Sequence, residues 1–259
     1  MSEVSSTEFD DGVAIVVGGS GGIGAAVCAT LARRGANVAL TYLNRAAAAE
    51  AVADDVRKAG RQAIVGQVDL QAAAALKAFV DAAAARFGRV HSVVYAAGPS
   101  FGFHFINELD PATWSRVIRS DVEGCFNLIW ASLPHLKRQG GGAIVAVITS
   151  AVDRPPPKDI LSAAPKAAIQ ALMRGLAREE ARFGIRANCV GPGWVDTGLG
   201  AEIMSNPAQA GFVQKFIAQI PQRRVGQAQE IADAVVFLLS DQARYVTGAT
   251  LPVAGGLQL

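Results

Sequence analysis

The stretch from Ala143 to Met173 holds side chains whose types could do chemistry. It reads as a buried strand over Ile144–Ile148, a loop with three consecutive prolines, and a long helix that carries Lys166. Ser162 stands four residues before this lysine, about one helical turn away. We therefore expect this stretch to form the floor of an active site.

A glycine-rich turn near the start of the chain is suited to a phosphate group. The apolar run Val13–Val17 predicts a strand buried on both faces. Glycines follow at once over 18–24 (GGSGGIG), and Ala25–Arg34 has helical periodicity. Glycines let backbone N–H groups approach a pyrophosphate at the start of a helix. The alternative is a plain glycine-rich turn, but the strand before it and the helix after it favour dinucleotide binding.

The end of the second predicted strand, Asn37–Thr41, bears on the kind of dinucleotide. A site for NAD(H) usually has an acidic residue here for the ribose 2′-hydroxyl, whereas an arginine suits the 2′-phosphate of NADP(H). This chain has Tyr42, Asn44 and Arg45 at that point and no acid. The alternative is that Arg45 simply opens a solvated helix, Ala46–Lys58. We favour NADP(H) over NAD(H).

Bulk composition excludes several classes of protein. The 259 residues carry a net charge of +2 with scattered basic residues, which argues against nucleic acid as a partner. No apolar run reaches the roughly 18 residues of a membrane span, and the polar segment 1–12 is no signal peptide. The three cysteines have no metal-binding spacing and indicate buried thiols in a reducing, cytoplasmic setting. We expect no metal site.

Strands and helices alternate along the rest of the chain. Further strands are predicted at Gln62–Gln67, Ser92–Ala96, Ala143–Ile148, Ile185–Val190 and Ala249–Val253. Further helices are predicted at Gln71–Arg86, Pro111–Leu136, Ser162–Phe183 and Ala228–Leu239. This order predicts an α/β fold, a Rossmann-like doubly wound parallel sheet flanked by helices, in one domain over 1–259. Ligands of such sheets lie at the carboxyl ends of the strands.

These motifs, in this order, resemble the short-chain dehydrogenase/reductase family over essentially the full length. The matching residues are VVGGSGGIG (16–24), Asp69-Leu70, Ala97-Gly98, Lys166, PGWVDT (192–197) and the segment Arg223–Gly256. The resemblance implies hydride transfer between NAD(P)(H) and a carbonyl/alcohol pair. It also implies a homo-tetramer built on the helices Pro111–Leu136 and Ser162–Phe183. At 198–223 the family has a substrate lid, which here is rich in small and apolar residues and suggests an apolar carbonyl substrate.

The resemblance also assigns residues to the nucleotide. The pyrophosphate, adenine, ribose and nicotinamide would be held by Gly18, Ser20, Gly22, Ile23, Gly24, Asp69, Leu70, Ala97, Gly98, Lys166, Pro192, Gly193, Val195 and Thr197.

The chain departs from the family in its catalytic set, which is Asn, Ser, Tyr and Lys. Only Lys166 is retained. The D-V-E-G match to the family's N-x-x-G pattern places Asp121 at the asparagine, and counting along the chain places Ser162 at the tyrosine and Thr149 at the serine, with Ser150 as the alternative. A serine hydroxyl is far less acidic than a phenol whose pKa of about 10 is lowered by a nearby ammonium. Asp121 adds negative charge near Lys166. We therefore expect an altered active site that lacks the usual acid.

Other side chains have both structural and functional readings. Ser162 suits a helix N-cap, with Pro165 in the first turn. His104 lies on the ligand edge and could supply a proton, although a solvated loop histidine is the simpler reading.

Strand alternation should turn Tyr95 away from the site, and Lys158 and Asp159 should be solvated. A set of aromatic and apolar residues either walls an apolar substrate pocket or packs in ordinary helices. These residues are Phe101, Phe103 and Phe105 after the fourth strand and Met204, Phe212, Phe216 and Ile217 in the lid.

Two functions remain open from the sequence. The first is an NADP(H)-dependent oxidoreductase that takes its proton from water, His104 or the substrate. The second is a non-redox protein that keeps the nucleotide as a structural or regulatory ligand, or that is itself a partner subunit in an oligomer.

Overall fold

A computed structural model describes residues 9, 12–98 and 102–259. In this part of the chain seven parallel strands form one sheet in the order β3-β2-β1-β4-β5-β6-β7. The strands are β1 (Val13–Val17), β2 (Asn37–Tyr42), β3 (Ala63–Gln67), β4 (Val90–Tyr95), β5 (Gly142–Val147), β6 (Ile185–Pro192) and β7 (Thr250–Val253). The predicted doubly wound sheet is confirmed.

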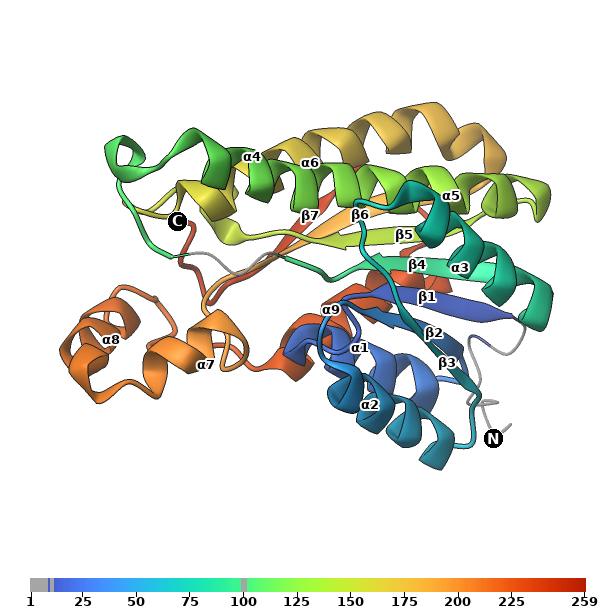
Figure 1. The fold of residues 1–259 in the computed structure, drawn as a ribbon, viewed down its shortest axis with the longest axis horizontal. Coiled ribbons are helices and arrows are strands. Elements are labelled where there is room, and N and C mark those ends of the chain that lie inside the picture. Colours follow the sequence, from blue (N-terminus) through green and yellow to red (C-terminus); the bar gives the residue numbers. More distant parts are fainter. Residues whose placement is uncertain (1–8, 10–11, 99–101) are drawn as a thin grey trace.

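Helices cover both faces of the sheet because its central strands are apolar on both sides (Figure 1). One face carries α3 (Ala73–Phe87), α5 (Gly124–Arg138) and α6 (Ile160–Glu180), whose apolar side chains form one core. The other carries α1 (Gly22–Arg33), α2 (Ala46–Lys58) and α9 (Ala228–Leu239), which form a second core. The cysteines Cys28, Cys125 and Cys189 are buried free thiols in these cores, as expected.

The strand order reverses between β1 and β4, which are neighbours in the sheet although β2 and β3 lie between them in sequence. At such a switch point the connections leave on opposite faces and open a crevice at the carboxyl ends of the strands. The glycine turn after β1 and residues Ala97 and Gly98 after β4 both lie at this crevice. The fold thus brings together two motifs that are almost eighty residues apart in sequence.

Two predicted helices differ from the structure in ways that matter for the site. The helix expected over Pro111–Leu136 consists of α4 (Pro111–Ile118), a π-helical segment at Arg119–Glu123 and α5. A π-helical segment widens the helix by one residue per turn and is frequent at functional sites. Asp121 lies in that segment and is buried. The helix expected to begin at Ser162 begins at Ile160 instead, with Asp159 as its N-cap.

The lid segment folds as two short helices that project from the body of the protein (Figure 1). They are α7 (Leu199–Met204) and α8 (Ala210–Ile217). No helix in the described part of the chain is long and apolar enough to cross a membrane.

Candidate functional site

The glycine turn after β1 leaves no room for side chains. Gly18 has a φ of +75°, which favours glycine, and its carbonyl accepts a hydrogen bond of 3.0 Å from the Gly21 N–H. A Cβ on Gly24 would lie 2.2 Å from the Gly18 carbonyl oxygen, and a Cβ on Gly22 would lie 1.5 Å from the Thr197 Oγ1. Thr197 follows β6, so the turn and the segment after β6 are in contact.

This turn opens α1 with features suited to an anion. The N-cap is Gly21, which offers no side chain to the first N–H groups, and the first turn contains no acidic residue. Those N–H groups have no partner within the helix and together attract negative charge. Ser20 lies in the turn and Ile23 packs against the core below. The geometry of the turn is thus compatible with a pyrophosphate, and its binding there stays a prediction.

Arg45 lies at the end of β2 as the exposed N-cap of α2. Within the described residues its guanidinium has no hydrogen bond or ion pair, so it can contact a ligand. Tyr42 is the last residue of β2 and packs against the core, while Asn44 is exposed. These positions border the outer part of the crevice.

Asp69 and Leu70 follow β3, and each accepts a hydrogen bond that holds the loop after β3 in place. The Asp69 Oδ1 accepts a hydrogen bond of 2.9 Å from the Gln71 N–H, and the Leu70 carbonyl accepts one of 2.8 Å from the Asn127 Nδ2. The Leu70 bond ties the β3 loop to α5. These contacts position the loop beside the crevice.

Lys166 is the centre of a buried polar cluster. Its Nζ donates to the Ala97 carbonyl at 3.0 Å and to the Asp121 Oδ1 at 2.8 Å, and the lysine residue is only 8% exposed. A Cβ on Gly98 would lie 3.9 Å from the same Nζ. An ammonium has three N–H donors, so one remains for a ligand in the crevice. The structure thus joins Lys166, Asp121, Ala97 and Gly98, as the sequence predicted.

Tyr95 belongs to this cluster, although strand alternation alone turned it away from the site. Its hydroxyl donates to the Asp121 Oδ1 at 2.7 Å and to the Asp121 carbonyl at 2.9 Å. The Lys166 Nζ lies 5.0 Å from the centre of the Tyr95 ring. Burial, and then the Asp121 charge, raise the pKa of this phenol above its ordinary value. Tyr95 therefore stays protonated and acts as a hydrogen-bond donor.

Thr149 and Ser162 both keep free hydroxyl protons beside the site. Thr149 follows β5, and its Oγ1 accepts a hydrogen bond of 3.1 Å from the Ala151 N–H. The Ser162 hydroxyl has no hydrogen-bond partner among the described residues. The N-cap reading of Ser162 was wrong, because Ser162 lies inside the first turn of α6 and donates its own N–H to the Asp159 carbonyl at 3.0 Å. Pro165 lies inside this helix too, where it removes one backbone bond.

The loop before α6 also differs from expectation. Asp159 was expected to be solvated, but it is buried and only 9% exposed. Lys158 is exposed, with its Nζ 4.5 Å from the centre of the Phe105 ring. The Lys158 carbonyl accepts a hydrogen bond of 3.2 Å from the His104 N–H, so the loops after β4 and before α6 are joined. Periodicity could not have indicated the burial of Asp159, because three prolines and Lys158 come directly before it.

Aromatic rings form the wall of the lid that faces the segment after β6. The Trp194 ring centre lies 4.4 Å from that of Phe216 and 6.0 Å from that of Phe212, which is 53% exposed. Phe103 and Phe105 are also exposed, at 42% and 46%. Phe101 lies outside the described residues. Large exposed apolar side chains thus occur on the loop after β4 and on α8.

The segment after β6 closes the site from the other side. Pro192 ends β6, and the Gly193 N–H donates to the Val253 carbonyl at 3.1 Å. Val195 is buried and pairs with Gly226 in an isolated β-bridge. This framework holds Thr197 against Gly22.

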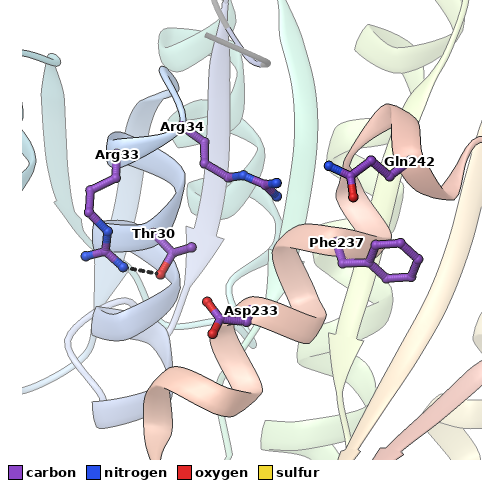
Figure 2. A pocket seen from close by; sticks show the side chains of 6 residues that line it. All are labelled: Thr30, Arg33, Arg34, Asp233, Phe237 and Gln242. Carbon is purple, nitrogen blue, oxygen red and sulfur yellow. Dashed lines mark hydrogen bonds between the residues drawn. The ribbon is translucent and has the colours of Figure 1, made fainter. Parts of the chain in front are cut away.

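A separate pocket of about 360 Å³ lies between α1 and α9, away from the crevice (Figure 2). It is lined by Thr30, Arg33, Arg34, Asp233, Phe237 and Gln242. Thr30 lies eight residues along α1 from Gly22, toward the opposite end of the helix, and the Arg33 Nη2 donates to the Thr30 Oγ1 at 2.9 Å. This polar pocket does not share residues with the predicted site. No cluster of potential metal ligands occurs among the residues that the structure describes.

Comparison with known proteins identifies the family. Residues 17–258 match the family model described as enoyl-(acyl carrier protein) reductase. The chain is 32% identical over 248 residues to the 3-oxoacyl-[acyl-carrier-protein] reductase FabG of Staphylococcus aureus strain Mu50, covering 95% of this chain and 98% of that protein. The chain belongs to the short-chain dehydrogenase/reductase family. The uncharacterized oxidoreductase YgfF of Escherichia coli strain K12 is 35% identical over 248 residues, covering 94% and 99% of the two chains.

A solved dehydrogenase structure agrees with this assignment. The NAD⁺-bound xylitol dehydrogenase superposes with a TM-score of 0.90 at 29% identity, covering 96% of this chain and all of that one. These comparisons support an NAD(P)-dependent oxidoreductase of the short-chain type.

Proposed function

We propose that this protein is an NADP(H)-dependent short-chain oxidoreductase that acts on a carbonyl/alcohol pair without the family's tyrosine acid. The observation that carries the proposal is the position of Lys166. Its ammonium lies in hydrogen-bond contact with the Ala97 carbonyl at the carboxyl end of β4, with one donor left for the nicotinamide ribose. The glycine cradle at Gly22 and Thr197 supplies the site for the pyrophosphate.

Arg45 supports NADP(H) over NAD(H). Its exposed guanidinium lies at the end of β2 with no described partner, where the family binds the adenosine ribose. Guanidinium groups bind phosphate through two parallel hydrogen bonds, which a ribose hydroxyl cannot match. Binding of the 2′-phosphate would therefore use a group that the protein leaves free.

Nucleotide titration tests this assignment. Arg45→Ala should weaken NADPH binding by about tenfold, equal to about 1.4 kcal/mol, while NADH binding changes by less than about twofold. Arg57→Ala is the matched control, because Arg57 lies in the last turn of the same helix and pairs with Asp54 at 2.7 Å. An equal loss for both nucleotides in Arg45→Ala would refute the preference for NADP(H).

The substrate is proposed to be a small apolar carbonyl compound. The rings of Trp194, Phe212 and Phe216 form an apolar wall on the lid, and apolar ligand surface gains free energy when it leaves water against such a wall. Assays with a series of ketones of increasing chain length should show kcat/KM rising with chain length. A preference for charged or short polar ketones would contradict this assignment.

We also propose a homo-tetramer. Phe126 and Trp130 lie one turn apart on α5 and are 52% and 47% exposed, and Trp114 on α4 is 38% exposed. An apolar patch of this kind on one helix pair suits a symmetric interface. Light scattering coupled to size exclusion should give four times the chain mass, and Trp130→Glu should lower it.

The second candidate function is a nucleotide-binding protein that does not transfer hydride. The ion pair between Lys166 and Asp121 favours it, because that pair uses the ammonium charge that would otherwise acidify a neighbouring hydroxyl. Wild type that binds NADPH and reduces no member of a broad ketone panel, while Ser162→Tyr gains turnover, would support this second function over the first.

A further inference from the structure

Lys166 and Asp121 form a buried ion pair beside the crevice, and stability alone does not explain the second charge. The Lys166 Nζ lies 2.8 Å from the Asp121 Oδ1, and the two side chains are 10% and 2% exposed. A buried ion pair can often be replaced by apolar side chains of similar volume without loss of stability. An amide at position 121 would also offer the ammonium an oxygen acceptor, without a buried negative charge. The carboxylate therefore calls for a functional explanation.

The surroundings hold the Asp121 carboxylate in a fixed position. Its Oδ1 accepts hydrogen bonds from the Lys166 Nζ at 2.8 Å and from the Tyr95 hydroxyl at 2.7 Å. The Tyr95 hydroxyl also donates to the Asp121 carbonyl at 2.9 Å, which fixes the backbone of the π-helical segment. Burial raises the pKa of Tyr95 and of the neighbouring Cys125 thiol, so both stay uncharged. The charges of this cluster are therefore those of Lys166 and Asp121.

The cluster lies on the β4 side of the crevice, opposite the side proposed for the adenosine half of a nucleotide. The glycine turn after β1 is the proposed pyrophosphate site, and Arg45 after β2 is the proposed contact of the adenosine ribose. Strands β2 and β4 flank β1 on opposite sides of the sheet. The nicotinamide half therefore belongs toward β4, where the Lys166 Nζ donates to the Ala97 carbonyl at 3.0 Å. The remaining N–H of the ammonium is available to the ribose that carries the nicotinamide.

A charge beside this half of the site distinguishes the two redox states of the nucleotide. The nicotinamide ring is positively charged in the oxidised form and neutral in the reduced form. A lone Lys166 ammonium would therefore repel the oxidised form and leave the reduced form almost unaffected. The Asp121 carboxylate offsets that repulsion, which an uncharged amide could not do. At an effective dielectric constant of about 20, two unit charges about 10 Å apart change an affinity by roughly tenfold.

We propose that Asp121 sets the preference of this protein between the oxidised and the reduced nucleotide. By offsetting the charge of Lys166, it lets NADP⁺ bind at least as tightly as NADPH. Tyr95 holds the carboxylate against the ammonium without adding a charge of its own. Because tighter binding of one form draws the bound pair toward that form, Asp121 favours ketone reduction over alcohol oxidation on the protein. The inference rests on the nucleotide site proposed above.

Asp121→Asn tests the role of the charge, because it keeps the shape of the side chain and an oxygen acceptor. The dissociation constants of NADP⁺ and NADPH are measured separately by isothermal titration calorimetry. The ratio of the NADP⁺ constant to the NADPH constant should rise about tenfold in Asp121→Asn. Glu123→Gln removes an exposed acid from the same π-helical segment and is the matched control. It should leave the ratio unchanged, because water screens an exposed charge.

Two further variants separate charge from structure. Tyr95→Phe removes a hydrogen bond from the carboxylate but no charge, so both affinities should fall together and their ratio should stay as in wild type. Asp121→Asn combined with Lys166→Met removes both charges. It should weaken both nucleotides through the lost ribose contact and return the ratio to its wild-type value. A raised ratio in either variant would mean that packing, and not charge, sets the preference, and would overturn the proposal.

The remaining outcomes separate this proposal from the functions proposed above. An unchanged ratio in Asp121→Asn overturns the role of Asp121 while the nucleotide site stands. Tighter binding of NADPH than of NADP⁺ to wild type also overturns it, and this measurement needs no variant to fold. A wild type that binds only NAD(H) is tested by the same ratios with NAD⁺ and NADH, and one that binds neither nucleotide refutes the site and the proposal together. The expected ratios without reduction of any ketone refute the oxidoreductase function alone.

Discussion

The buried pair of Lys166 and Asp121 makes a quantitative prediction about stability. The two side chains are 10% and 2% exposed, and the Nζ–Oδ1 distance is 2.8 Å. Removal of one partner leaves the other charge buried and uncompensated, which typically costs about 3–5 kcal/mol. We expect Asp121→Ala and Lys166→Met each to lower the free energy of unfolding by about this amount.

The double variant separates the charge pair from ordinary packing. Asp121→Ala with Lys166→Met leaves no buried charge, so its cost should be less than the sum of the single costs by about 2–3 kcal/mol. Tyr95→Phe tests the third member, because it removes a 2.7 Å hydrogen bond to a charged acceptor. That loss should cost about 1.5–3 kcal/mol in wild type, and less when Asp121 is already alanine, where the Tyr95 hydroxyl keeps only its bond to the main-chain carbonyl at position 121.

Urea unfolding at neutral pH, followed by tryptophan fluorescence, measures these values. The variants must keep the wild-type dependence of the free energy on urea concentration, so that midpoints can be compared. Single costs that add to the double cost within about 0.5 kcal/mol would refute the coupling. Arg57→Ala, which breaks an exposed ion pair, is the control and should cost less than about 1 kcal/mol.

Three further predictions concern other parts of the fold. Gly22→Ala should weaken nucleotide binding at least tenfold in titrations, because its Cβ would displace Thr197, whereas Gly211→Ala in the open lid, where no atom lies within 4 Å of the added Cβ, should not. Burial lowers the pKa of His91 to about 4, so its contribution is complete above about pH 6.5 and is lost as the pH falls toward 4. His91→Gln should remove about 3 kcal/mol of that pH dependence in unfolding experiments. Arg186→Met should lower the free energy of unfolding by about 3 kcal/mol, because Arg186 donates to the Leu238, Leu239 and Ser240 carbonyls at the end of α9; a cost below about 1 kcal/mol would contradict this.

Local patterns were enough for the architecture. Val13–Val17 and the exact bounds of α2 and α9 follow from apolar periodicity, because a strand or an amphipathic helix buries its own apolar face wherever it lies. The glycine turn after β1 and the place of Arg45 at the end of β2 were also predicted, since each depends on a few consecutive residues. The D-V-E-G match to the family pattern predicted that Asp121 adds negative charge near Lys166, and the ion pair confirms this.

Only the tertiary structure decided which polar groups meet. Tyr95 and Asp121 come from different elements, and they bond because the π-helical segment turns Asp121 toward β4. The burial of Asp159 depends on the loop after β4 folding against the loop before α6, which no local pattern records. Periodicity reports the face that a residue takes on its own helix or strand. The partner and the solvent exposure of a polar side chain depend on elements far away in the sequence, and these set its charge and its chemistry.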